Sequence, residues 1–251
     1  MIPHEYVNAK DKASNPSILQ QAIEGHVLVK NIKSALPLNA PRVLSIYGYG
    51  ATVSSDSGPG AGVIRGQTYD PWPQNWQAVN LSVQNIQVIQ RNEPLEDPPV
   101  TYAGILTVGG GSGSNAQSYI SSLYAATQAR AYEDNTELFS DFTSYDPQVV
   151  GSPDAYLIFI NAFASEIWDR SQLADESSNM LVNNVASQCN NKIVVIHNAG
   201  IRLVGAWTDN PNVTAVIFAH LAGQDAGRGP AQILYEDVSP SGRLPYTIGE
   251  K

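Results

Sequence analysis

One short stretch near the middle of the chain carries side chains suited to proton transfer. Residues 161–170 read Asn-Ala-Phe-Ala-Ser-Glu-Ile-Trp-Asp-Arg and follow the apolar run 156–160, which predicts a buried strand. Glu166 lies between Phe163 and the ring of Trp168, where partial loss of solvent would raise its pKa and suit its carboxyl to donate a proton. This stretch is therefore the first candidate for a catalytic site.

Two further charges complete the stretch and leave a second interpretation open. Asp169 and Arg170 are expected to pair with each other and to hold the loop in shape. The same three charges would also suit a solvated surface turn with no chemical role. Spacing alone favours neither interpretation.

Other chemical motifs are weaker. The run 109–114, Gly-Gly-Gly-Ser-Gly-Ser, could cradle a phosphate, but it lacks the Lys-Ser/Thr ending of such loops, and a tight turn is favoured. No Gly-x-Ser-x-Gly elbow is present, which argues against a serine hydrolase. The histidines, His4, His26, His197 and His220, include no pair at i, i+4, which argues against a catalytic zinc. No cofactor is expected. His197 and His220 follow predicted strands and would either line a cleft or be hydrogen-bonded structural residues.

Composition limits the possible partners. The chain has 251 residues, a net charge of −9 and a pI near 4.8, so nucleic acid and anionic membranes would be repelled and a neutral or cationic ligand is expected. Cys189 is the only cysteine, which excludes an intrachain disulfide. Neither a membrane-spanning run nor a secretory signal is expected from the pattern. Asn80 and Asn212 begin sequons that would matter in a secreted protein.

The elements that must position these residues alternate regularly. Strands are predicted over residues 42–47, 103–108, 155–160, 192–197 and 213–218, and helices from Asn15 and over residues 116–131, 175–189, 201–208 and 224–235. Apolar strands separated by amphipathic helices predict an α/β fold: one domain with a doubly wound, mostly parallel sheet and helices on both faces. Residues 51–99 are expected to form a long ordered excursion.

The fold class indicates where ligands would bind. In open α/β sheets they settle outside the carboxyl ends of the strands. The loops to consider are therefore residues 48–50, 109–114, 161–170, 197–200 and 219–228.

Stretches spread over almost the whole chain resemble one known family. They are residues 24–31, 35–38, 109–113, 128–131, 159–170, 194–202, 211–216, 223–228 and 237–247. The last, Asp-Val-Ser-Pro-Ser-Gly-Arg-Leu-Pro-Tyr-Thr, is the most specific. On these stretches the chain resembles the α/β sandwich domain of glycoside hydrolase family 3, in particular that of fungal β-glucosidases.

The resemblance implies a role for each residue of the opening stretch. Members of this family are retaining glycosidases in which a barrel domain supplies the nucleophilic aspartate and a loop of the sandwich supplies the acid/base glutamate. Glu166 matches that glutamate, and the implied substrate is a β-glucoside or oligosaccharide. Trp168, Asp169 and Arg170 are the implied substrate-binding residues, although the Trp168 ring would serve equally as a hydrophobic prop beneath the loop. A retaining mechanism needs two carboxyl groups about 5 Å apart, of which Glu166 can be only one.

The resemblance also sets expectations for organisation. Residues 1–40 would form a linker and first helix, residues 41–251 the sandwich, and a (β/α)8 barrel would be the missing structural partner. The chain alone is then expected to be inactive. A noncatalytic module that binds sugar or protein, and a nonfunctional remnant, stay open as alternatives. Ile167 departs from the glycine of fungal members. An extracellular location with glycosylation at Asn80 and Asn212 is likewise implied by the resemblance.

Overall fold

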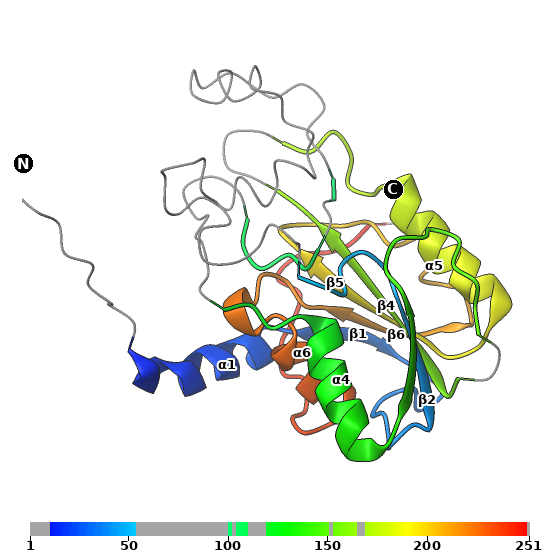
Figure 1. Ribbon diagram of the computed structural model, residues 1–251. Helices are drawn as coiled ribbons and strands as arrows, with labels where there is room; N and C mark the ends of the chain where they lie inside the picture. Colours follow the sequence, from blue (N-terminus) through cyan, green and yellow to red (C-terminus); the bar gives the residue numbers. More distant parts are fainter. Residues whose placement is uncertain are drawn as a thin grey trace, which may run out of the picture.

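A six-stranded sheet forms the centre of the molecule. The computed structural model describes residues 11–53, 100–101, 104–109, 119–150, 153–164 and 169–249. The sheet has the order β1-β6-β5-β4-β2-β3, with β1 Val27–Asn31, β2 Val43–Tyr47, β3 Glu137–Asp141, β4 Ala155–Ala162, β5 Lys192–Asn198 and β6 Val213–Phe218. All neighbouring strands pair in parallel except β1, which is antiparallel to β6 (Figure 1). The predicted doubly wound, mostly parallel sheet is confirmed.

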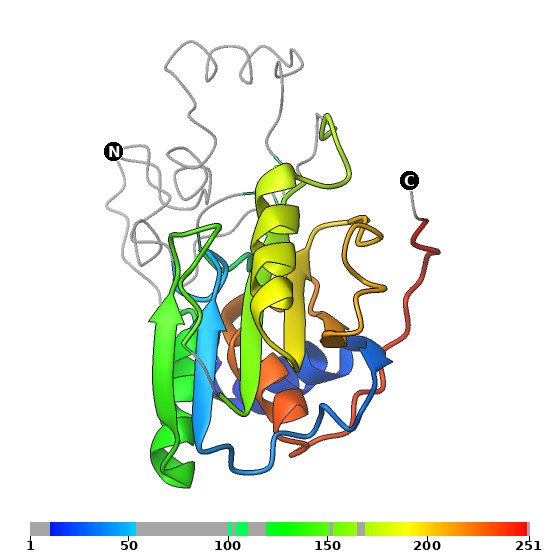
Figure 2. The same ribbon diagram turned by 90° about the vertical axis from the view of Figure 1, so that its right-hand side faces the viewer.

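Helices cover both faces of this sheet. The helices α1 (Asn15–Glu24), α4 (Leu123–Asp134) and α6 (Arg228–Leu234) lie on one face, and α5 (Glu176–Gln188) lies on the other (Figures 1 and 2). Each layer has its own apolar core because successive strand side chains point to opposite faces. In β4, for example, Leu157 packs with the α1, α4 and α6 layer, whereas Ile158 packs with α5. Every residue of β4, β5 and β6 is buried.

The order of connections creates a topological switch point between β2 and β4. These two strands are parallel neighbours. β2 leads through α4 to β3 on one side, whereas β4 leads through α5 to β5 on the other. Because the two connections turn in opposite directions, the space outside the carboxyl ends of β2 and β4 is where ligands bind in such sheets. The loop that begins at residue 163 starts at this point.

Side-chain caps fix where the helices beside this space begin. Ser122 accepts a hydrogen bond from the backbone N–H of Ala125 (3.0 Å) at the start of α4. Asp175 accepts one from the N–H of Ser178 (2.7 Å) at the start of α5. Each bond satisfies a backbone donor that the first helical turn leaves without an internal partner. The α5 cap matters further, because Asp175 also contributes to the strand-end site.

Two predicted elements are absent from the part of the chain that the structure describes, and two observed strands were not predicted. Of the predicted strand 103–108, the described residues 104–108 are irregular, since the N–H of Ile105 donates to Thr52 O and the N–H of Gly223 donates to Thr107 O. Residues 201–204 are irregular and residues 205–209 form turns, where a helix over 201–208 was predicted. β3 escaped prediction because its residues are half exposed at the sheet edge and show no apolar run. β1 lies within the segment expected to be linker and first helix.

The predicted helix 224–235 is divided in two. A 3₁₀ turn, η3 (Gly223–Asp225), precedes α6, which begins at Arg228. Pro230 therefore falls in the first turn of α6, where its missing N–H leaves no hydrogen bond unmade. Gly227, just before the helix, allows a close approach, because an added Cβ would fall on the carbonyl group of Ser122. This contact brings the start of α6 against the start of α4.

Candidate functional site

The site is built on the carboxyl ends of β2 and β4. Gly48 follows β2 with a φ of 98°, and an added Cβ would fall on the carbonyl oxygen of Phe159 in β4. Only glycine tolerates both this backbone conformation and this contact. The chain can therefore turn sharply here and place Tyr49 over the end of β4.

Tyr49 joins β4 to α5. Its hydroxyl oxygen accepts a hydrogen bond from the backbone N–H of Asn161 (3.2 Å) and lies 2.7 Å from the hydroxyl of Ser178. Burial, followed by the nearby charge of Asp175, raises the pKa of Tyr49 to about 12, so it stays neutral. Asn161 is itself fully buried, and its Nδ2 donates to Gly104 O (2.9 Å). These bonds hold the end of β4 rigidly before the loop begins.

A buried ion pair lies beside this network. Nη1 of Arg202 is 2.6 Å from Oδ1 of Asp175 and donates to Asn161 O (3.2 Å). The Arg202 side chain is fully buried, and that of Asp175 is 15% exposed. Nε and Nη2 of Arg202 have no hydrogen-bond partner within the described residues. A guanidinium so placed is strongly held by its carboxylate because little water screens the pair.

The structure places two of the predicted site residues. Asp169 is exposed, whereas Arg170 is half buried and its Nη2 donates to Ile201 O (2.5 Å). Within the described part of the chain the two form no ion pair, so the expected Asp169–Arg170 pairing is wrong. Burial, and then the neighbouring charge of Arg202, lowers the pKa of Arg170. Arg170 holds the loop through the backbone of the next strand-end loop.

Several predicted residues lie outside the described residues. They are Glu166, Ile167, Trp168 and Asn80, together with residues 110–114 of the glycine-rich run and residues 54–99 of the long excursion. The two segments that flank residues 165–168 are described, and they end at Ala164 and begin again at Asp169. The structure therefore describes the two ends of this loop, up to Ala164 and from Asp169 onward.

The histidines after β5 and β6 take different positions. His197 is fully buried, and its Nε2 is hydrogen-bonded to Ala226 O (3.0 Å), as expected of a structural histidine. Burial, and then the proximity of His26, lowers the pKa of His197 to about 3. His220 is half buried, with its ring stacked beside Phe218 (6.3 Å between ring centres). Burial lowers its pKa as well.

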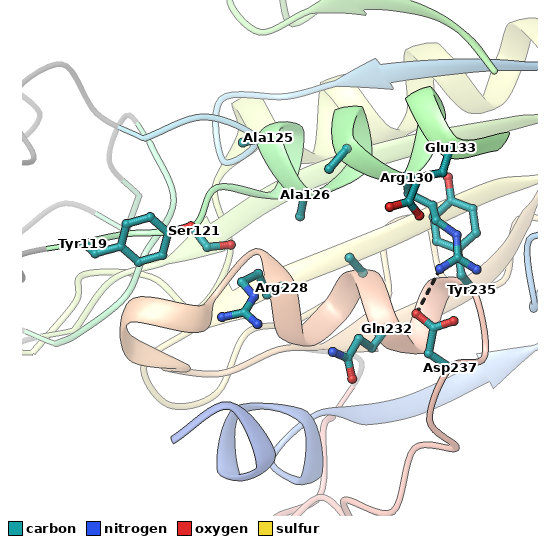
Figure 3. Close-up of a pocket in the computed structure, with 12 residues that line it drawn as sticks. Tyr119, Ser121, Ala125, Ala126, Arg130, Glu133, Arg228, Gln232, Tyr235 and Asp237 are labelled. Carbon is teal, nitrogen blue, oxygen red and sulfur yellow. Dashed lines mark hydrogen bonds and ion pairs between the residues drawn. The ribbon is translucent and has the colours of Figure 1, made fainter. Parts of the chain in front are cut away.

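A cavity of about 400 Å³ lies between α4 and α6, away from this loop (Figure 3). Alanines of both helices line it, and charged side chains stand around it. The guanidinium of Arg130 lies 4.7 Å from the ring centre of Tyr235 and 3.2 Å from Oδ2 of Asp237. The charged lining residues are two arginines, Arg130 and Arg228, and two acids, Glu133 and Asp237, so their formal charges cancel. Neither Asp169 nor Arg170 lines this cavity. We assign this cavity no part in the chemistry.

Two general features are absent from the described residues. Within those ranges no helix combines the length and apolar character needed to cross a membrane. Nor do the same residues bring together three histidine, cysteine, aspartate or glutamate side chains in a group that could hold a metal ion.

Sequence reasoning missed the residues that organise the strand ends. Arg202, Asp175 and Tyr49 were not predicted as site residues. A signal for Arg202 was present, because a lone arginine in the stretch Gly-Ile-Arg-Leu-Val is a charge among apolar neighbours that needs a buried partner. No comparable signal identified that partner, since Asp175 reads simply as a helix cap.

The mostly parallel sheet with a charged loop at its strand ends defines an α/β domain with a ligand site at that edge. Comparison with known proteins identifies its family. Residues 26–251 match the glycosyl hydrolase family 3 C-terminal domain, and the chain belongs to that family. It is 48% identical over 249 residues to a protein of Aspergillus fumigatus named probable beta-glucosidase M. That match covers 99% of this chain but 28% of the relative, so the chain spans little more than a quarter of the relative's length.

Solved structures share the same fold. A glycoside hydrolase family 3 beta-glucosidase from Neurospora crassa matches with a TM-score of 0.74 and 30% identity, over 95% of this chain and 26% of that one. A beta-glucosidase from Chaetomium thermophilum matches with a TM-score of 0.73 and 30% identity, over the same shares of the two chains. The predicted family is confirmed.

Proposed function

We propose that this chain is the part of a retaining β-glucosidase that supplies the acid/base carboxyl, with Glu166 as that group and a β-glucoside or oligosaccharide as substrate. The observation that carries the proposal is the position of the segment 161–170, which leaves the carboxyl end of β4 at the switch point between β2 and β4. Ligands bind at such points. Relatives that are named beta-glucosidases match 98–99% of this chain.

The proposed reaction divides its work between two carboxyl groups. In the first step a nucleophile from a barrel domain attacks the anomeric carbon while Glu166 donates its proton to the departing glycosidic oxygen. In the second step the ionised Glu166 takes a proton from water, whose oxygen attacks the anomeric carbon and releases the nucleophile. The chain needs no cofactor for either step. A barrel domain is thus the proposed structural partner, and the chain alone is inactive.

Residues near Glu166 take supporting roles in this proposal. Trp168 offers a ring face to a sugar, and Asp169 is exposed and free to accept hydrogen bonds from sugar hydroxyls. Arg170 has one guanidinium edge committed to Ile201 O, while its Nη1 has no hydrogen-bond partner among the described residues. We therefore propose Arg170 as a residue that supports the loop more than as one that grips substrate.

A domain exchange tests the proposed function. This chain would replace the matching 28% of the Aspergillus fumigatus relative, and hydrolysis of 4-nitrophenyl β-glucoside would be compared for the chimera, that relative, the relative without this segment, and this chain alone. Activity in the chimera with none in the truncated relative or in the isolated chain is the expected result. A folded chimera that shows no activity above the truncated relative would reject the proposal.

The noncatalytic alternative predicts a different result in the same set of proteins. A binding module would retain affinity for glucose or cellobiose without any barrel, and Trp168→Ala would weaken it. Calorimetric titration of the isolated chain measures this directly. Saturable binding by the isolated chain, together with an inactive chimera, would favour the binding module.

We also propose an extracellular location with N-linked glycans at Asn80 and Asn212. The support is the family together with the two sequons. Asn212 is half buried, and its Nδ2 donates to Ala186 O (3.0 Å), which leaves one of its two hydrogens for replacement by a sugar. In a fungal secretion host, the chimera is expected in the medium, with a mass that falls on endoglycosidase treatment. Asn80→Gln and Asn212→Gln should each remove one glycan, and an unchanged mass would refute that site.

A further inference from the structure

Both segments flanking residues 165–168 are tied to one neighbouring loop. We call residues 161–164 the N-side stem, residues 169–175 the C-side stem and residues 199–203 the platform loop. Four hydrogen bonds make the ties: Ala199 N–H to Ala162 O (2.8 Å), Arg202 Nη1 to Asn161 O (3.2 Å), Arg170 Nη2 to Ile201 O (2.5 Å) and Leu203 N–H to Leu173 O (2.9 Å). The first two hold the N-side stem and the last two hold the C-side stem. Neither stem can shift without displacing the platform loop.

Arg202 connects the two stems through a single nitrogen. Its Nη1 contacts Asn161 O in the N-side stem and Oδ1 of Asp175 in the C-side stem (2.6 Å). Each contact alone would fix one stem, and together they fix the separation of the stems. Asp175 in turn is held by the N–H of Ser178 at the start of α5, so the bridge is anchored to a rigid helix.

The composition of this bridge is poorly suited to stability alone. Arg202 is fully buried with Nε and Nη2 lacking partners in the described part of the chain. A second guanidinium, that of Arg170, lies near enough for its charge to oppose that of Arg202. Buried ion pairs with unsatisfied donors stabilise a fold no better than apolar side chains of similar volume. What the arrangement does provide is a defined geometry for the stems.

We infer that Arg202 is a positioning residue for the acid/base carboxyl, because it fixes the two stems that flank Glu166 in the sequence. The inference rests on the proposed function of Glu166. A carboxyl that must reach the glycosidic oxygen within hydrogen-bond distance loses most of its effect when it is displaced by about 1 Å. Arg202 itself touches no reacting atom and is not a catalytic residue.

The test separates a misplaced acid from a generally weakened protein. In the active chimera, Arg202→Lys and Arg202→Met would be assayed on aryl β-glucosides that differ only in the leaving ability of the aryl group. A phenyl leaving group needs the proton, whereas a 2,4-dinitrophenyl group departs without it. Full general acid catalysis contributes about 10²–10⁴-fold, so kcat/KM for the phenyl glucoside should fall about tenfold or more. For the dinitrophenyl glucoside it should change by less than about twofold, with Lys milder than Met.

Matched variants keep the result interpretable. Val194→Ala leaves a cavity in a fully buried position of β5, and Arg42→Met breaks an exposed ion pair with Asp154. Both should lower the phenyl and dinitrophenyl rates equally, if at all. Should Arg202→Met fail to fold, Arg170→Met removes the Ile201 tie from a half-buried position and should show the same leaving-group dependence. Equal losses on both substrates in the folded Arg202 or Arg170 variants would overturn the inference.

The outcome distinguishes this inference from the proposed function. Glu166→Gln should itself show a leaving-group dependence, and Arg202→Met added to it should increase that dependence no further. If Glu166→Gln loses rate equally on both substrates, the proposed function fails. If Glu166→Gln behaves as expected and Arg202→Met does not, only the positioning role fails.

Discussion

Replacing Glu166 by glutamine in the active chimera is expected to lower kcat/KM for phenyl β-glucoside by about 10²–10⁴-fold, the usual contribution of general acid–base catalysis. The amide cannot donate a proton to the departing oxygen, although it is nearly the same size. For 2,4-dinitrophenyl β-glucoside the loss in kcat/KM should stay below about tenfold. Steady-state kinetics on the two glucosides measure the contrast.

Added azide gives this prediction an independent check. The variant also lacks the base that activates water, so the glycosyl intermediate should accumulate and kcat with the dinitrophenyl substrate should be low. Azide needs no deprotonation, so it should restore kcat and form β-glucosyl azide, with retention expected from two displacements. Glu176→Gln, an exposed carboxylate ten positions further on, is the matched control and should behave as the parent. Absence of azide rescue in a folded Glu166→Gln chimera would contradict the assignment.

Acid is expected to unfold this chain through two buried histidines, the second large effect. Burial lowers the pKa of His26 from 6.5 to about 4 and is the main reason that the pKa of His197 falls to about 3. Below pH 6.5 the unfolded chain binds protons that the folded chain refuses, so the free energy of unfolding decreases as pH falls. Each histidine should contribute a loss of about 1.4 kcal/mol per pH unit, down to about pH 4 for His26 and about pH 3 for His197.

Urea unfolding between pH 7 and pH 4.5 measures this effect. The variant His197→Gln keeps a donor where Nε2 meets Ala226 O but cannot titrate, and His26→Asn does the same for the Nδ1 contact with Ala22 O. Each should be less stable at pH 7 yet lose less stability as the solution is acidified. His220→Gln, at a half-buried position, should alter the pH dependence less. A pH dependence unchanged in both buried-histidine variants would show that other groups control acid unfolding.

Sequence patterns predicted the central layer well because burial leaves a strong trace. β4, β5 and β6 are buried along their whole length and appear as unbroken apolar runs, and α5 is marked by the Asp175 cap. Patterns failed where backbone bonds are made to distant loops. β3 is an edge strand with few apolar residues, and the segment after Gly104 bonds to Thr52 and Gly223, which no local pattern reveals.

The site was predictable only in part for a related reason. A charged cluster after a buried strand directs attention to residues 161–170, because strand ends are where α/β sheets bind ligands. The partner of Arg170 could not be read from the chain, since the acceptor is a backbone carbonyl 31 positions away. Likewise, Arg202 and Asp175 meet only because β4 and β5 are neighbours in the sheet. Such pairings depend on the order of strands in the sheet. Sequence adjacency alone had suggested Asp169, not Ile201 O, as the partner of Arg170.

The antiparallel pairing of β1 with β6 determines where this domain can be cut. β6 is buried along its whole length, and β1 is the strand that covers its outer edge. α1, just before β1, packs against α6 near the other end of the chain, with Ala22 and His26 beside Gly229. An expressed fragment that starts after Asn31 would bare a hydrophobic edge open to intermolecular strand pairing and precipitation. A recombinant boundary should therefore precede α1, upstream of residue 26, where the family match begins.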